Sequence, residues 1–259
     1  MVHASGTQRH GEGRQAIAHK VAVITDAHAN LPALEAALGA IADAGCQAIY
    51  HTGDAIGIGP YPAECLDRLL HTPNVRLVMG NHDEWFAHGL PHPPPPWMSE
   101  GELAHQRWVH DQLSPSLRPV VAAWPYTIHE EFAGTQVTFT HYGREASGRG
   151  FVPIVSVARP ADLDAVFRSH RADLVFYGHH HPTSDLIGRA RYVNPGALGC
   201  SPVPVARFCT VSFADGGYAL EQHAVPYDAT ELFRQFEERS VPERDFIRTT
   251  FFGQVAGAG

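Results

Sequence analysis

Short apolar runs alternate with helical segments in the first third of the chain, and this pattern limits the possible folds more than any other feature. Residues 20–25 (KVAVIT), 48–52 (AIYHT) and 75–79 (VRLVM) are brief and rich in β-branched residues. Such runs are typical of strands that are buried on both faces. One helix is expected after Asn30, which can cap it, and another over 63–70. The resulting β-α-β-α-β order predicts an α/β fold with a mainly parallel sheet and helices on its faces.

The remainder of the chain predicts a mixture of helices and strands. Residues 91–96 (PHPPPP) exclude a helix or a central strand, so we expect a stiff loop, inserted near 88–98. Ser99 and Glu102 resemble a capping box that opens a helix running to about Leu113. The later segments predict, in order, a hairpin over 126–141, a helix over 161–170, a strand over 173–177, two short strands over 185–193, a hairpin over 207–225 and a helix from about 229.

Composition sets the domain organisation and removes several kinds of partner. The 259 residues, 44% of them hydrophobic, suit one large domain or two small ones. No segment marks a convincing boundary, so we expect a single domain over 19–259 after a flexible lead-in at 1–18. The net charge of −8 gives no electrostatic reason to expect a polymeric nucleic acid as partner, and no apolar run could span a membrane. A homo-oligomer stays open.

Cysteine usage and the N-terminal residues indicate the compartment. The four cysteines lie far apart and include no CxxC pair, which argues against a thiolate zinc site. Residues 1–15 lack the apolar core of a signal peptide. We therefore expect a reducing, cytoplasmic setting.

Polar side chains capable of metal binding follow the expected strands. They are Asp26 and His28, Asp54, Asn81 and His82, His141, and His179 to His181. In open α/β sheets, ligands bind at the carboxyl ends of the strands, so these residues predict one shared site. Carboxylate, amide and imidazole donors without a thiolate suit borderline divalent ions such as manganese, iron, zinc, cobalt or nickel.

Each motif has an ordinary explanation when it is taken alone. Gly53-Asp54 is a common dipeptide, residues 80–83 (GNHD) favour a turn, and three adjacent histidines can be an incidental metal-binding tract. Their joint order, with each motif placed after an expected strand, favours a functional site over chance.

The complete series of motifs resembles a known family. Asp26-x-His28, Gly53-Asp54, residues 80–83 (GNHD), the single His141 and residues 178–181 (GHHH) are similar to the pattern of the calcineurin-like metallophosphoesterases. Residues 53–70, 194–199 (NPGALG) and 225–228 (VPYD) are similar to the small bacterial and archaeal phosphodiesterase branch. The resemblance spans residues 20 to about 228. It implies a metallophosphoesterase-type sandwich of two mixed β-sheets flanked by helices.

The resemblance also implies a centre of two divalent metal ions, with manganese as the first expectation. One metal would be held by Asp26, His28 and His181, and the other by Asn81, His141 and His179. Asp54 would bridge the two, because only a carboxylate brings compensating charge to both cations. A hydroxide bound to the metals would attack phosphorus in line with the leaving oxygen.

Four further residues have expected roles around this centre. His82 would protonate the leaving group, and Asp83 would orient the His82 ring. Arg144 could contact a phosphate oxygen, although a solvated surface arginine is the competing interpretation. His180 should face away from the metals, because alternate side chains of an extended segment point in opposite directions.

The leading functional hypothesis is a metal-dependent phosphoesterase that hydrolyses small phosphodiesters, with cyclic nucleotides as one candidate. A phosphomonoesterase or a dinucleoside-polyphosphate hydrolase is the alternative, and a non-catalytic scaffold is disfavoured by the full ligand set. Substrate choice should depend on the loops at 85–100 and 142–153. Residues 91–97 are expected to border the mouth of the site, or else to be a surface spacer.

Overall fold

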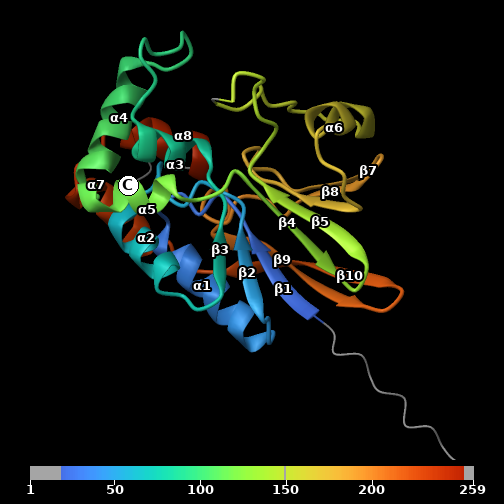
Figure 1. Cartoon of the computed structure of the whole chain (residues 1–259). Helices are drawn as coiled ribbons and strands as arrows, with labels where there is room; N and C mark the ends of the chain where they lie inside the picture. The colour runs from blue at the N-terminus through green and yellow to red at the C-terminus, as the bar shows by residue number, and fades with distance from the viewer. Residues whose placement is uncertain (1–18, 149, 254–259) are drawn as a thin grey trace, which may run out of the picture.

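Two five-stranded mixed sheets face each other, and helices cover their outer faces (Figure 1). The computed structural model describes residues 19–148 and 150–253. The expected lead-in at 1–18 lies outside the described residues. Within the described part of the chain, no helix is both long enough and apolar enough to cross a lipid bilayer.

The first sheet contains the β-α-β-α-β unit that the sequence predicts. Its strand order is β10-β9-β1-β2-β3. The strands are β1 (His19–Ile24), β2 (Ala48–His51), β3 (Val75–Leu77), β9 (Val205–Ala214) and β10 (Gly217–Pro226). β1, β2 and β3 run parallel, whereas β9 pairs antiparallel with both β1 and β10. The late hairpin thus completes a sheet that the first third of the chain begins.

The second sheet is also mixed and has the order β4-β5-β6-β8-β7. Its strands are β4 (Thr127–Phe132), β5 (Thr135–Thr140), β6 (Leu174–Phe176), β7 (Ser184–Ile187) and β8 (Arg191–Asn194). β5, β6 and β8 are parallel, and the outer strands β4 and β7 are antiparallel to their neighbours. Two mixed sheets flanked by helices confirm the expected fold class.

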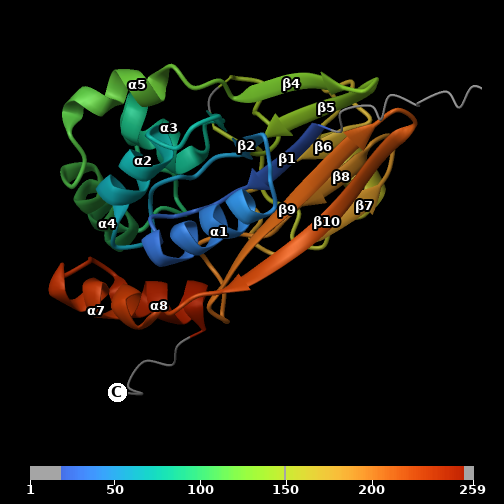
Figure 2. The same cartoon turned by 90° about the horizontal axis from the view of Figure 1, so that it is seen from below.

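Most helices lie on the side of the first sheet. They are α1 (Leu31–Asp43), α2 (Pro62–Leu70), α3 (Asn81–His88), α4 (Glu100–Asp111), the short η1 (Pro115–Leu117) and α5 (Arg118–Ala122), α7 (Thr230–Glu238) and α8 (Arg244–Phe252). α6 (Pro160–Val166) packs beside the second sheet (Figure 1). Figure 2 shows the C-terminal helices α7 and α8 lying side by side at one edge of this helical layer.

The alternating direction of the side chains along each strand divides the core into layers. On β1, Val21 and Val23 face the second sheet, whereas Ala22 and Ile24 face the helices. Successive side chains of a strand point to opposite faces, so a strand between two layers must be apolar throughout. The continuous apolar run at 20–25 is therefore the signature of a central strand.

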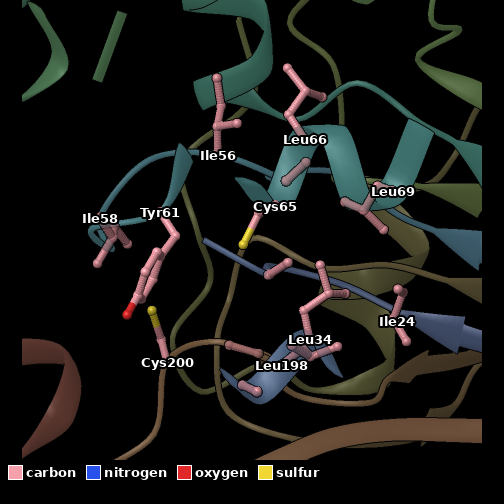
Figure 3. Close-up of a cluster of buried hydrophobic side chains, with 14 of the residues drawn as sticks. Ile24, Leu34, Ile56, Ile58, Tyr61, Cys65, Leu66, Leu69, Leu198 and Cys200 are labelled. Carbon is pink, nitrogen blue, oxygen red and sulfur yellow. The ribbon is translucent and has the colours of Figure 1, made fainter. Parts of the chain in front are cut away.

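The helix-side layer anchors the elements that carry the site. Ile24 at the end of β1, Leu34 of α1, and Leu66 and Leu69 of α2 gather in one buried cluster (Figure 3). Each such side chain contributes about 1.5–3 kcal/mol when it is fully buried. Asn30 caps α1 as expected, since its side chain accepts a hydrogen bond of 3.1 Å from the Ala33 amide.

Several elements differ from the expectations. β3 ends at Leu77 rather than at residue 79, and α3, α5 and α8 were not predicted. α3 begins inside the GNHD motif, where polar site residues obscure the apolar periodicity of a helix.

Candidate metal centre

The seven predicted metal ligands converge at the carboxyl ends of parallel strands. Strands β1, β2 and β3 of the first sheet and β5 and β6 of the second end at this common edge. The segments that follow them carry Asp26, His28, Asp54, Asn81, His141, His179 and His181, with Asn81 at the start of α3. The predicted site edge is thus where the structure brings these side chains together.

Main-chain hydrogen bonds join these loops. The Asp26 amide donates to the Gly53 carbonyl and the His28 amide to the Asp54 carbonyl, each at 3.0 Å. The two sheets are joined by His141, whose Nδ1 lies 2.8 Å from the Thr52 carbonyl oxygen. The loops after the first and second sheets are therefore fixed relative to each other before any ion binds.

One half of the site contains Asp26, His28 and His181. The Nε2 atoms of His28 and His181 lie 3.0 Å apart. Asp26 Oδ1 lies 3.6 Å from the first and 3.9 Å from the second of these nitrogens. These donors belong to the set that the resemblance assigns to one metal.

The other half contains Asn81, His141 and His179. His141 Nε2 lies 3.2 Å from Asn81 Oδ1 and 3.3 Å from Asp54 Oδ2. Ligand atoms of Asp54, His141 and His179 all lie within 4.8 Å of one another. Asp54 Oδ2 is also 3.8 Å from His28 Nε2, so this carboxylate lies between the two halves.

The donor set fits divalent cations. A carbonyl oxygen can only accept, so the Nδ1 of His28 at 3.3 Å from the Ile56 carbonyl carries the proton, as does that of His141 against Thr52. The Nε2 of His28 then faces His181 Nε2, and the Nε2 of His141 faces the oxygens of Asn81 and Asp54. Each of these close pairs can be bridged by a proton or by a metal ion, and orientation of a histidine by a carbonyl is the usual arrangement at metal sites.

Burial and mutual charge shift the titration of these groups. Burial raises the pKa of Asp26 to about 7 and lowers the pKa of His179 to about 3 and of His181 to about 4. Burial would also lower the pKa of His141, but the carboxylates of Asp54 and Asp26 outweigh it and raise that pKa to about 9. Protons and cations therefore compete for this negative site.

The backbone is strained around the same residues. Asp26, His28, Asp54 and His179 have φ values of 50°, 45°, 59° and 68°, in the left-handed region that non-glycine residues rarely adopt. Such strain persists where the surrounding structure fixes it, and it concentrates at functional sites. The positive φ of His179 also shows that residues 179–181 are not an extended strand, so the alternation argument used for His180 is wrong.

Close packing against Asp54 explains why a glycine, Gly80, precedes Asn81. A Cβ atom at this position would lie 2.1 Å from Asp54 Oδ1 and 2.3 Å from the Asp54 amide nitrogen. No side chain can be accommodated at those distances, so the glycine permits Asp54 and the start of α3 to approach each other.

Comparison with known proteins identifies the family. Residues 20–216 match the model of the calcineurin-like phosphoesterase superfamily domain. The chain belongs to this superfamily. The membership expected from the motifs is confirmed, and the family implies metal-dependent hydrolysis of phosphoesters.

Individual relatives agree with this placement. An uncharacterized protein of Methanocaldococcus jannaschii is 25% identical over 239 residues, which are 86% of this chain and 94% of the relative. The crystal structure of a metallophosphoesterase from Sphaerobacter thermophilus has a TM-score of 0.66 at 25% identity, covering 87% of this chain and 96% of that chain. A hypothetical protein from Pyrococcus horikoshii has a TM-score of 0.74 at 20% identity, covering 92% and 99%, and shows the shared fold.

In this phosphoesterase, His82 borders the metal centre but is oriented differently from the expectation. Both oxygens of Asp83 accept main-chain hydrogen bonds, from Asp54 at 2.8 Å, Ala55 at 3.1 Å and Gly80 at 3.0 Å. The expected role of Asp83 in orienting the His82 ring is therefore wrong, and Asp83 instead fixes the loop that presents Asp54.

Gln106 of α4 holds the His82 ring instead. Its Nε2 lies 3.0 Å from His82 Nδ1 and donates to Glu102 Oε1 at 2.9 Å. Gln106 Oε1 is the more distant amide atom, at 3.3 Å from His82 Nδ1. The closer contact, from Gln106 Nε2, leaves the second amide hydrogen for His82 Nδ1 and favours the ring proton on His82 Nε2. Sequence reasoning missed Gln106, although its i, i+4 spacing from Glu102 on an expected helix was visible.

Gln106→Leu should mimic a partial loss of His82. Without the amide, His82 keeps its place but loses its fixed tautomer, so we expect about tenfold slower hydrolysis of alkyl diesters, the effect of one lost hydrogen bond to the reacting group. Nitrophenyl esters, which need little protonation, should slow far less, and metal content should not change. An equal loss on both ester types would show that Gln106 supports the fold rather than the proton donor.

Cys200 is a neighbour of the centre that the sequence did not reveal. Its Sγ lies within 4.8 Å of ligand nitrogens of His28 and His181. Burial, with a smaller effect of the carboxylates of Asp26 and Asp54, raises the pKa of the Cys200 thiol well above its usual value. The sequence therefore missed one sulfur atom beside the nitrogen and oxygen donors.

His180 belongs to none of the metal-ligand groupings found among the described residues. Its side chain lines both the cavity above the metal centre and a neighbouring hollow of about 370 Å³. His180→Ala should therefore leave metal content almost unchanged, whereas the matched variant His179→Ala should lose metal from one position. Elemental analysis of both proteins tests this, and equal metal loss would show that His180 is a ligand.

Arg144 lies outside the site cavity, so its expected contact with a phosphate lacks structural support. Its guanidinium packs 3.5 Å over the Tyr126 ring and pairs with Glu84 at 3.3 Å. It is neither a solvated surface arginine nor a free cation beside the metals, since its side chain is 19% exposed and already paired.

The cavity above the centre has a volume of about 690 Å³, within the range of sites for small molecules. Its wall includes Asp54, Asn81, His82, His179 and His181. The rest of the wall is formed by residues 180, 182–183, 200–202 and 250–251 together with His28, Ile58, Ile154 and Arg207. No described residue of 91–97 lines it, so the structure favours the spacer interpretation of the proline-rich loop.

Proposed function

We propose that this chain is a dinuclear metal-dependent phosphodiesterase that acts on small phosphodiesters. The observation that carries the proposal is the position of Asp54, whose carboxylate lies between two clusters of histidine nitrogens. In this proposal Asp26, His28 and His181 hold one ion, Asn81, His141 and His179 hold the other, and Asp54 contacts both. Manganese suits these nitrogen and oxygen donors.

Two divalent ions supply charge neutralisation for the phosphoryl oxygens and activation of the attacking water. The protein contributes the negative charge of Asp26 and Asp54, and the preorganised histidines. His82, whose ring proton Gln106 directs to Nε2, donates that proton to the leaving oxygen. Asp83 maintains the Asp54 loop through its three main-chain contacts.

The space around His82 favours a diester over a monoester. His82, Ile58 and Phe251 line the main cavity and also a second hollow of about 210 Å³ that includes Glu102 and Glu243. In this proposal the two ester arms of a diester would occupy the main cavity and this adjacent hollow, whereas a monoester would fill only one of these spaces.

A phosphomonoesterase or a dinucleoside-polyphosphate hydrolase is the alternative, because the same metal chemistry serves all three reactions. A non-catalytic scaffold is less favoured, since a scaffold has no need of a His82 ring that Gln106 holds beside the metal-ligand residues. The four free cysteines suit a reducing cytoplasm.

Hydrolysis of matched esters tests the proposal. The manganese-loaded protein should show a higher kcat/KM for bis(4-nitrophenyl) phosphate than for 4-nitrophenyl phosphate, which share a leaving group. Asp54→Asn should be inactive on both and serves as the control for contaminating phosphatases. A preference for the monoester would support the phosphomonoesterase, and no hydrolysis of any phosphoester by the metal-loaded protein would support the scaffold.

A further inference from the structure

One cation lines the cavity beside the metal centre. Among the described residues of its wall, Arg207 is the one arginine or lysine. It lies near the start of β9, far in sequence from the metal-binding motifs. The remaining ionisable wall residues are Asp54 and histidines, together with the weakly acidic thiol of Cys200.

Neighbouring residues hold Arg207 in place. Its Nη1 donates a 2.7 Å hydrogen bond to Ser201 Oγ, and Ser201 is itself buried. The arginine stem lies against Gly196, where a Cβ atom would come within 2.8 Å of Arg207 Cδ and 2.9 Å of Thr183 Oγ1. The same Cβ would be 3.4 Å from the His181 carbonyl oxygen, so the stem passes beside the segment that carries a metal ligand.

The charge of Arg207 has no internal partner. Within residues 19–148 and 150–253, no carboxylate lies within ion-pair distance of its guanidinium, in contrast to Arg144 with Glu84. A guanidinium has five N–H donors in a planar fork that matches phosphate and carboxylate groups. A half-buried arginine without a carboxylate, on the wall of a ligand cavity, is suited to an anion from outside the protein.

We propose that the substrate carries a second anionic group, a phosphate or a carboxylate, which Arg207 binds while the scissile phosphate lies at the metals. The inference rests on the proposed phosphoesterase function of the same site. Thr183 and Thr250 add hydroxyl donors to this part of the wall, and the Phe251 ring offers an apolar surface for the connecting atoms.

The charged residues of the two spaces differ. The hollow of about 210 Å³ beside His82 lacks Arg207 and is lined by Glu102 and Glu243. A second anion is therefore better placed in the main cavity, where Arg207 lies. We place this anion on the arm that the phosphoryl group keeps.

A series of diesters with one leaving group tests the inference. Manganese-loaded protein is assayed on 4-nitrophenyl diesters whose second arm is propyl, 2-carboxyethyl or 2-phosphonoethyl. Wild type should prefer at least one anionic arm by about tenfold or more in kcat/KM, the range of one charge-assisted contact. Preference for the carboxylate or for the phosphonate identifies which anion the site takes.

Arg207→Gln should erase this preference while hydrolysing the propyl diester within about threefold of wild type, because the propyl arm has no anion for Arg207 to bind. Arg207→Lys, which retains the charge without the fork, should keep part of the preference. Elemental analysis of each variant should show unchanged metal content. Equal activity of wild type on all three arms, or an equal loss on all three in Arg207→Gln, would overturn the inference.

Calorimetric binding separates this inference from the proposed function. Methylphosphonate, 2-carboxyethylphosphonate and ethane-1,2-diphosphonate are titrated into manganese-loaded wild type and Arg207→Gln. If wild type binds either of the last two compounds more tightly than methylphosphonate and Arg207→Gln loses that gain, the Arg207 subsite is supported even if all three diesters are inert, an outcome that would refute only the diesterase. The same gain, or no gain, in both proteins would overturn the subsite.

Discussion

Asp54→Asn should empty both metal positions or nearly so. The Asp54 carboxylate lies 3.3 Å from His141 Nε2 and 3.8 Å from His28 Nε2, so one negative charge serves both halves of the centre. Asparagine keeps the size of the side chain and an oxygen for the His82 amide, which donates to Asp54 Oδ1 at 2.9 Å. The change thus removes charge with little change in shape, and two cations then lie close together without compensation.

Elemental analysis after dialysis against manganese measures this effect. We expect wild type to retain about two ions per chain and Asp54→Asn to retain well below one. Hydrolysis by the variant should be slower by three or more orders of magnitude, which is a rise of about 4 kcal/mol in the activation free energy. His180→Ala serves as the control, because it alters the same cavity without changing a residue of either cluster. Retention of both ions by Asp54→Asn would show that the carboxylate does not bridge them.

His82→Ala should separate substrates by their leaving groups. His82 is buried, reaches within 4.8 Å of ligand atoms of His28 and Asp54, and is oriented by Gln106. An alkoxide leaves poorly without a proton, whereas nitrophenolate is a stable anion. General acid catalysis is typically worth about 10²–10⁴-fold, so the variant should lose that much on alkyl diesters and only a modest factor on nitrophenyl esters.

The metal content of His82→Ala decides how its kinetics are interpreted. Both ions should remain, because the two clusters hold their ligands without His82. The Gln106→Leu variant should show the same leaving-group dependence in weaker form. Equal losses on both ester types with both ions present would mean that His82 positions the substrate or stabilises charge and does not donate a proton.

The metal centre could be predicted because its geometry follows from strand order. Asp26, Asp54 and Asn81 each follow a parallel strand of one sheet, and the carboxyl ends of parallel strands meet at one edge. The apolar run at 20–25 likewise indicates a strand that is covered on both faces. Local sequence therefore determines both the position of the centre and the layers around it.

Other parts of the site depend on contacts between distant segments. Gln106 reaches His82 from α4, Arg207 enters the cavity from β9, and Phe251 comes from a helix that was not predicted. Nothing in the residues next to them signals these contacts. Asp83 shows the reverse case, since its proximity in sequence to His82 suggested a contact that its three main-chain hydrogen bonds exclude.

Coupled measurement of bound metal and hydrolysis is the most direct test of the central claim. The protein is stripped with a chelator, reconstituted with increasing manganese, and assayed on bis(4-nitrophenyl) phosphate at each step. The account predicts saturation at about two ions per chain, with activity absent from the stripped protein and restored as the sites fill. Saturation at no more than trace metal in a folded protein, or hydrolysis that survives complete removal of metal, would contradict it.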